Sequence, residues 1–191
     1  MNEFIKSIIL GIVEGITEFL PVSSTGHLII VTRFIDFKGE FANVFDIVIQ
    51  MGAILAVVVF FWNRIFPFSK NKTSEEKKNI FDLWLKAIAG VIPALIIGGI
   101  FGKYIKQNLF NPIIVSIALV LGGVVLIFLE TRKKISTINS ISELTYKTAF
   151  FIGVVQCLSM IPGTSRSAAT IIGAMMLGTS RIVAAEFSFF L

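Results

Sequence analysis

The chain has 191 residues, of which 55% are hydrophobic and 15% are charged, whereas an ordinary soluble domain is about 25% charged. With a mean hydropathy of +0.87 and a single cysteine, it is excluded from the disordered, disulfide-scaffold and ordinary water-soluble classes. The net charge of +5 comes from basic residues between apolar stretches, which is typical of membrane-protein loops and not of a nucleic-acid-binding face. We therefore expect an all-α, polytopic integral membrane protein that binds no nucleic acid.

The first apolar stretch, residues 7–35, is interrupted in its middle by Pro21. Proline has no backbone N–H to donate and disfavours helix in the residue before it. We expect two short helices, Ser7–Phe19 and Gly26–Ile35, each about half as long as a membrane crossing. Such a pair predicts a re-entrant hairpin that enters the bilayer, turns near its midplane and leaves on the same side.

Three uninterrupted apolar segments follow. They are Ile47 to Trp62, Trp84 to Gly102 and Pro112 to Leu129. Each approaches the roughly 20 residues that cross a hydrocarbon core about 30 Å thick. We expect all three to be transmembrane helices.

The segment between Lys147 and Arg181 is interrupted like the first stretch. Arg166 is its only charged residue, and Pro162 and Gly163 stand in its middle. A continuous helix of this length would reach about 50 Å, which is too long for one crossing. We expect a second re-entrant hairpin, formed by Ala149–Met160 and Ser167–Leu177.

The two interrupted segments resemble each other in sequence. From Gly11 the chain reads GIVEGITEFLPVSSTGHLII, and from Gly153 it reads GVVQCLSMIPGTSRSAATII. Both contain an apolar helix, a proline, a turn rich in serine and threonine, and a second apolar helix. This similarity predicts a repeat-built membrane protein.

The charges of the loops indicate that the repeats have inverted topology. The loops 64–78 and 132–147 carry five and four Lys or Arg residues and are expected on the cytoplasmic side. The hairpins then enter from opposite sides, and their turns meet near the midplane. We expect one membrane domain over residues 1–191, with repeat 1 at about 1–64, linking helices at about 80–130 and repeat 2 from about 145. The last apolar helix stops early, so we also expect that the chain is incomplete at its C-terminus.

Chemistry is expected first at Glu14 and Glu18. Their spacing of four residues puts both carboxylates on one helix face, and carboxylates inside a membrane mark functional sites by default. They suit a divalent cation or a general base, and the alternative is a hydrated pair at a helix end. The turn that follows brings Ser23, Ser24 and Thr25 to a helix start, which is an anion-binding arrangement. The alternative is ordinary N-capping by Ser24 or Thr25, and both can hold if one hydroxyl caps while others face a ligand.

His27 and Arg166 complete the set of candidate catalytic residues. His27 is the only histidine, and beside two glutamates it is a candidate base or nucleophile. Arg166 lies in the second turn, and its planar guanidinium suits a phosphate; the alternative is a salt bridge to Glu14 or Glu18. Substrate-binding candidates are the hydroxyl and glycine positions of both turns: Ser23, Thr25, Gly163, Thr164, Ser165, Ser167 and Thr170. Weaker candidates are Asp46, Gln50, Gln156, Arg181 and Glu186.

The segments EGITEFLPVSSTGH and PGTSRSAAT resemble the two signature regions of the bacterial undecaprenyl-pyrophosphate phosphatase family, whose members are also called bacitracin-resistance proteins. The resemblance covers essentially the whole chain and includes the later run SRIVAAEFSFFL. Members of the family are longer and continue with further apolar helices. The family's functional positions match the glutamates at 14 and 18, the histidine at 27, the hydroxyl turn at 23–25 and the SRS run at 165–167.

The resemblance implies an enzyme of the bacterial plasma membrane with inverted repeats and a site open to the outer face. It would remove the terminal phosphate of undecaprenyl pyrophosphate and so return the lipid carrier to cell-wall synthesis. The implied cofactor is a divalent cation, Mg²⁺ or Ca²⁺, held by Glu14 and Glu18. The nucleophile stays open between Ser24, His27 and water, and a homodimer stays open as the assembly.

Two other classes compete with this interpretation. Inverted repeats with broken helices are also a transporter architecture, so a flippase of a phosphorylated carrier lipid would use the same arginine and helix starts without hydrolysis. Binding alone does not require Glu14, Glu18 and His27 together, which favours the phosphatase. A purely structural subunit is disfavoured because ionisable groups inside a membrane are costly.

Overall fold

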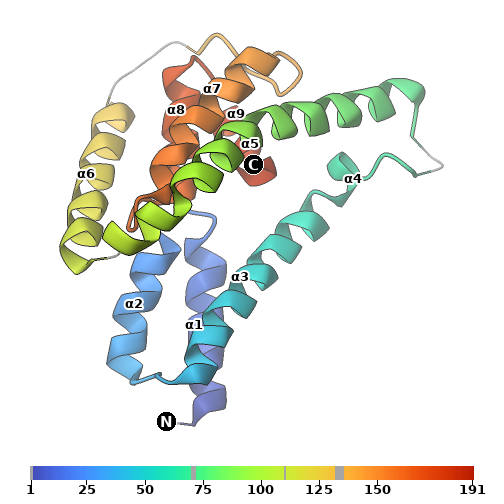
Figure 1. The fold of residues 1–191 in the computed structure, drawn as a ribbon. Coiled ribbons are helices and arrows are strands. Elements are labelled where there is room, and N and C mark those ends of the chain that lie inside the picture. Colours follow the sequence, from blue (N-terminus) through green and yellow to red (C-terminus); the bar gives the residue numbers. More distant parts are fainter. Residues whose placement is uncertain (1, 70–71, 110, 132–135) are drawn as a thin grey trace.

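The computed structural model describes residues 2–69, 72–109, 111–131 and 136–191, and over these ranges the chain is built from helices (Figure 1). The expected all-α class is therefore confirmed. The helices are α1 (Glu3–Thr17), α2 (Ser24–Ile35), α3 (Glu40–Phe60), α4 (Trp62–Ile65), α5 (Ser74–Asn108), α6 (Pro112–Thr131), α7 (Tyr146–Gln156), the 3₁₀-helix η1 (Cys157–Met160), α8 (Arg166–Met176) and α9 (Arg181–Phe190).

Two helix pairs approach each other from opposite ends of the molecule (Figure 1). In the first pair α1 and α2 are joined by the turn 18–23, and in the second pair α7 with η1 is joined to α8 by the turn 161–165. Both interruptions thus lie where proline predicted them. In each pair the second helix begins behind a serine N-cap: Ser23 Oγ accepts from the N–H of Gly26 at 3.3 Å, and Ser165 Oγ accepts from that of Ala168 at 3.2 Å. These caps satisfy backbone donors that a helix start otherwise leaves unpaired.

The long helix α5 packs closely against α7. A Cβ atom added at Gly153 of α7 would lie 1.9 Å from the carbonyl oxygen of Gly90 in α5. Two glycines therefore let the backbones touch, as small residues do in packed membrane helices. The adjoining apolar core is formed by Leu83, Leu144, Ala149, Ile152, Ile171, Ala174, Ala184 and Phe187.

Helix α6 lies across both turns. A Cβ atom at Gly26, at the start of α2, would be 3.4 Å from a methyl carbon of Leu119. One at Gly163, in the second turn, would be 2.5 Å from the carbonyl oxygen of Val115. Gly163 also has a φ of +94°, which side-chain-bearing residues rarely adopt. The contact with α6 and the backbone conformation thus both require glycine at this position.

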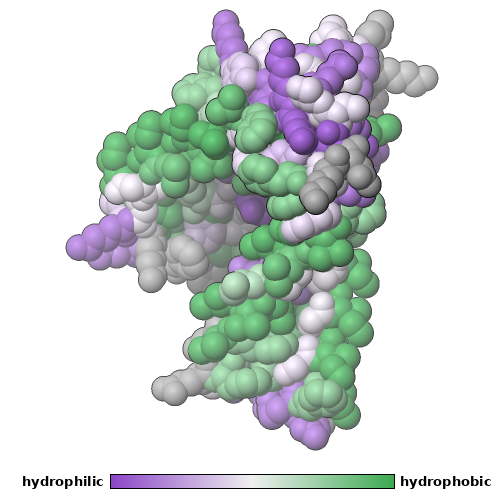
Figure 2. All heavy atoms as spheres, turned by 90° about the vertical axis from the view of Figure 1, so that its right-hand side faces the viewer, coloured by the Kyte–Doolittle hydropathy of each residue, from purple (hydrophilic) through white to green (hydrophobic). Residues whose placement is uncertain are grey.

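Large apolar side chains are exposed along several helices. On α1 they form a stripe that includes Ile8, Ile12 and Ile16, and others cover α3 and α6. Figure 2 shows a largely hydrophobic face, with hydrophilic residues gathered toward its upper end and its lower tip. Exposure on this scale is expected where lipid contacts the helices instead of water.

The lengths of the helices bear on the expected membrane crossings. Among the described residues, one helical span, Ser74–Ile105, is long and apolar enough to cross a bilayer. Ile47–Phe60 and Ile113–Leu129 are shorter apolar segments, which lie in α3 and α6. The expected first and third crossings, Ile47 to Trp62 and Pro112 to Leu129, therefore remain predictions.

The contact between α5 and α7 predicts unequal effects of two matched substitutions. Gly153→Ala puts a methyl group into the backbone of α5, and we expect it to lower the free energy of unfolding by about 1–3 kcal/mol. Gly11→Ala, at the corresponding position of α1, meets no atom within 4 Å and should be neutral or slightly stabilising. Thermal unfolding of both variants in detergent measures the difference. Equal transition temperatures would contradict the close contact.

Candidate active site

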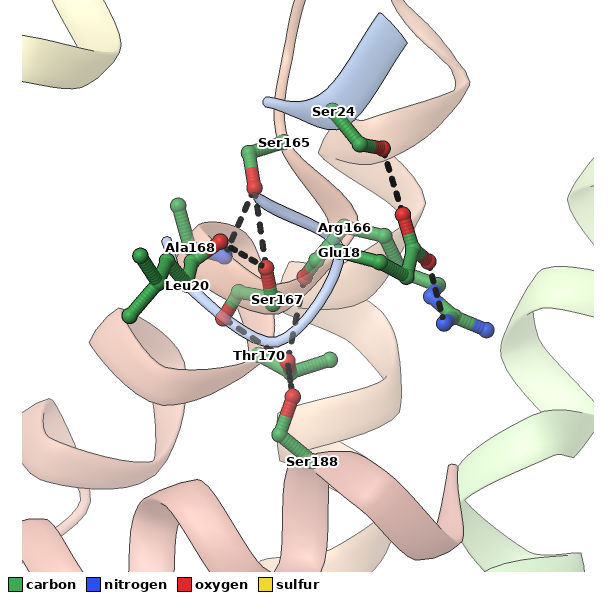
Figure 3. A network of polar contacts seen from close by, with 9 residues as sticks. All are labelled: Glu18, Leu20, Ser24, Ser165, Arg166, Ser167, Ala168, Thr170 and Ser188. Carbon is green, nitrogen blue, oxygen red and sulfur yellow. Dashed lines mark hydrogen bonds and ion pairs between the residues drawn. The ribbon is translucent and has the colours of Figure 1, made fainter. Parts of the chain in front are cut away.

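The carboxylate of Glu18 lies at the centre of the polar contacts between the two turns (Figure 3). Glu18 directly follows α1, and its backbone N–H donates to the carbonyl oxygen of Glu14 at 2.9 Å. One carboxylate oxygen, Oε2, accepts a hydrogen bond from the hydroxyl of Ser24. The other, Oε1, accepts from the Nη2 of Arg166 at 3.0 Å. Residues from α1, α2 and α8 therefore meet at one carboxylate.

The two turns are also joined by a neutral hydrogen bond. The hydroxyl of Ser167 donates to the carbonyl oxygen of Leu20 at 3.1 Å (Figure 3). The side chains of Glu18 and Arg166 are 24% and 49% exposed, so their ion pair is partly hydrated. Such a pair contributes little to stability, and it leaves the guanidinium accessible to an anion.

A polar pocket of about 290 Å³ opens beside this ion pair. Helix starts contribute most of its wall, because α2 and α8 both begin there and their first N–H groups favour anions. The described residues that line it are Glu18, Ser23, Ser24, Thr25, Gln50, Ile54, Ser159, Thr164, Ser165, Arg166 and Ser167. A carboxylate, a guanidinium and several hydroxyls in one pocket suit a phosphorylated ligand and acid–base chemistry.

The pocket brings together most of the predicted site residues, including Gln50, one of the weaker candidates. Four of the stronger candidates do not line it, and one of these, Gly163, lies in the second turn against α6. Glu14 is 1% exposed, inside the first helix pair. The exposed ring of His27 has its Nδ1 2.9 Å from the carbonyl oxygen of Ser23. Thr170 is buried, and its hydroxyl contacts the carbonyl oxygens of Arg166 and Ser167 and the hydroxyl of Ser188.

Glu186, Gln156 and Arg181 do not line the polar pocket. Glu186 of α9 forms an ion pair with Arg64 of α4. Gln156 is 7% exposed, and its Oε1 has no hydrogen-bond partner among the described residues. Arg181 is the first residue of α9. The side chain of Asp46 lies outside the described part of the structure.

Ser159 is a polar pocket residue that the sequence did not single out. It belongs to η1 and lines the polar pocket. Its position, three residues before Pro162, was the available signal. A helix that approaches a proline loses its regular hydrogen bonds, so hydroxyls in that turn are free to face a pocket.

The pocket suits a divalent cation that arrives with phosphate groups. Mg²⁺ is typically bound by one or two carboxylates together with waters and substrate phosphates. Glu18 is the acidic side chain that lines the pocket among the described residues, and in the same ranges no group of three His, Cys, Asp or Glu is placed to hold a metal. Glu18 and the neighbouring hydroxyls therefore fit as partial ligands. Glu14 as a second ligand stays a prediction.

Comparisons with known proteins assign the chain to a family. Residues 7–191 match the model of the family described as bacitracin resistance protein BacA, and the chain belongs to this family. An undecaprenyl-diphosphatase of Enterococcus faecalis is 52% identical over 195 residues, which span 99% of this chain and 71% of the relative. An undecaprenyl-diphosphatase 1 of Clostridioides difficile is 53% identical over 99% of this chain and 70% of the relative.

Thr170 is predicted to support the site without binding substrate. Thr170→Val removes its hydrogen bonds to Ser188 and to the first turn of α8, and we expect a loss of about 1–2 kcal/mol in the free energy of unfolding. Because Thr170 does not line the pocket, the KM for substrate should stay within about twofold. Thermal unfolding and steady-state phosphate release test the two parts. A large rise in KM at unchanged stability would instead place Thr170 in the binding site.

Proposed function

We propose that this chain hydrolyses undecaprenyl pyrophosphate to undecaprenyl phosphate and inorganic phosphate, and so returns the lipid carrier to cell-wall synthesis. Membership of the family supports the reaction, because relatives about half identical in sequence carry the name undecaprenyl-diphosphatase. The structural observation that carries the proposal is the Glu18 carboxylate, which joins a hydroxyl of one helix start to a guanidinium of the other. A carboxylate, a hydroxyl and a guanidinium are thus adjacent in one pocket, which supports roles as base, nucleophile and anion-binding group.

The pyrophosphate is bound by the guanidinium and the two helix starts. Arg166 offers donors suited to phosphate oxygens, and the N–H groups at the starts of α2 and α8 add partial positive charge. These groups are fixed before the substrate arrives, and fixed donors stabilise the charge that develops during phosphoryl transfer. A bound divalent cation would supply further charge neutralisation of the phosphate oxygens.

The proton acceptor in this reaction is Glu18. Its Oε2 takes the proton of the Ser24 hydroxyl as Ser24 Oγ bonds to the terminal phosphorus, while the bond from that phosphorus to the bridging oxygen breaks. Undecaprenyl phosphate leaves, and water then cleaves the phosphoserine. In the second route Glu18 deprotonates a water molecule that attacks the same phosphorus directly. The Ser24–Glu18 hydrogen bond has the nucleophile–base geometry of the first route.

The arrangement in the membrane is part of the proposal. The helix pairs α1–α2 and α7–α8 act as re-entrant hairpins of two inverted repeats in the bacterial plasma membrane, and the pocket opens to the outer face. Support comes from their opposed directions in Figure 1, the serine cap at each second helix and the related sequences from Gly11 and Gly153. A homodimer remains a prediction.

Two substitutions test the reaction. Glu18→Gln removes the base and Arg166→Ala the phosphate donor, so each should lower phosphate release from undecaprenyl pyrophosphate by at least about 100-fold. The assay uses purified protein in detergent with Mg²⁺ or Ca²⁺, and a chelator should abolish the release. Arg33→Ala, at the far end of α2, is the control and should keep its activity. Bound lipid without phosphate release in the folded wild type would overturn hydrolysis and favour a flippase.

A second comparison ranks the candidate nucleophiles. We expect Ser24→Ala to lose at least about 100-fold in kcat, and His27→Gln to lose less than about tenfold, because the His27 ring does not line the polar pocket. Trapping of a phosphoserine by rapid acid quench would separate the two routes. A larger loss for His27→Gln than for Ser24→Ala would make the histidine part of the chemistry.

A further inference from the structure

An apolar groove adjoins the polar pocket on the side of α6. Its volume is about 750 Å³, within the roughly 300–1,000 Å³ of typical ligand pockets. We call it the α6 groove, and its walls come from α6, both turns, η1 and α8. Its apolar lining includes Ile114, Leu121 and Ile127 of α6, Leu158 of η1 and Ile172 of α8.

The few polar side chains of the α6 groove mark where it meets the polar pocket. Among its described lining residues the hydroxyl side chains are Ser23, Thr164 and Ser165, and these same three also line the polar pocket. No charged residue is among the described residues that line the groove. Groove and pocket together form one amphipathic channel, which is polar at the turns and apolar along α6.

We propose that the α6 groove binds the first isoprene units of the substrate's polyprenyl chain while the pyrophosphate occupies the polar pocket. This inference rests on the proposed function. An amphiphile whose head group lies among Ser23, Thr164 and Ser165 needs an apolar surface that starts at the same residues. The α6 groove meets that requirement, and burial of the chain there is favoured by the hydrophobic effect.

A second apolar cavity competes for the chain. It measures about 430 Å³ and lies between α3, α5 and α9, with Val57, Ala87 and Phe189 among its lining residues. We call it the α3–α5 cavity. It meets the polar pocket at Glu18, Arg166, Ser167 and Ile54, so an apolar chain that entered it would pass the ion pair and displace water from both charges. The α6 groove is larger and is entered past neutral hydroxyls.

A larger side chain at Gly122 would narrow the α6 groove without disturbing the fold. Gly122 lines this groove, and an added Cβ meets no atom within 4 Å. Leucine is also a better helix former than glycine. Gly122→Leu should raise the KM for undecaprenyl pyrophosphate about tenfold with kcat little changed, because it removes binding common to ground and transition states. For ethyl diphosphate, which carries no isoprene unit, kcat/KM should stay within about twofold.

Two matched substitutions separate the α6 groove from other apolar surfaces. Gly99→Leu lies on α5, also with no atom within 4 Å of the added Cβ, and should leave both substrates unaffected. Ala87→Leu narrows the α3–α5 cavity and should also leave the KM for the long substrate unchanged. A KM for the long substrate that rises for Ala87→Leu, or stays unchanged for Gly122→Leu, would overturn the proposal. So would an equal loss with both substrates in Gly122→Leu.

Photo-crosslinking tests the groove independently of turnover. A prenyl pyrophosphate with a benzophenone on its first isoprene units is irradiated with the wild-type chain in detergent, and the labelled peptide is identified by mass spectrometry. Labels within residues 114–127 support the proposal, and labels within 53–58 or 83–87 overturn it. If residues 114–127 are labelled but the protein releases no phosphate, the groove is supported and only the proposed reaction is overturned.

Discussion

The ion pair between Glu18 and Arg166 sets the character of the site, because it brings together two turns that are 148 residues apart in the sequence. Both groups are partly hydrated, so the pair adds little to stability. What holds the turns together is the packing of α6 across them and the neutral hydrogen bond from Ser167 to Leu20. The charged pair is therefore free for chemistry, since the fold does not depend on keeping it closed.

Backbone conformation is the second constraint on the site. Gly163 in one turn and Ser23 in the other have φ values of +94° and +62°. Glycine adopts this region without penalty, but for serine it costs free energy. The strain at Ser23 is offset locally, because its hydroxyl caps α2 and its carbonyl oxygen contacts the His27 ring. Ser24 follows directly and donates to Glu18, so the proposed nucleophile and base are positioned by the same few residues.

Much of this arrangement was accessible from the sequence. The prolines at 21 and 162 predicted the helix interruptions. The sequence also offered two interpretations of Arg166, phosphate binding and a salt bridge to Glu14 or Glu18. The burial of Glu14 could not be predicted from the sequence. A spacing of four residues puts two side chains on one helix face, but it also separates them by about 6 Å along the axis. Glu18 therefore reaches the turn, while Glu14 stays buried in the first helix pair. Glu186 was only a weaker candidate from the sequence, and its partner Arg64 is identified by the fold alone.

In the proposed reaction, the pairing of Arg166 with Glu18 links binding to catalysis. Before an anion arrives, one oxygen of the carboxylate is engaged by the guanidinium. A pyrophosphate that takes over donors of Arg166 weakens that contact and leaves the carboxylate free to accept a proton. The proton of Ser24 is then transferred more readily, at the moment when a phosphorus atom is present to be attacked. An apolar ligand or a neutral head group carries no negative charge that could compete with Glu18 for the guanidinium. In the proposed mechanism the charge of the substrate itself releases the carboxylate from the guanidinium, which favours diphosphate lipids over uncharged ones.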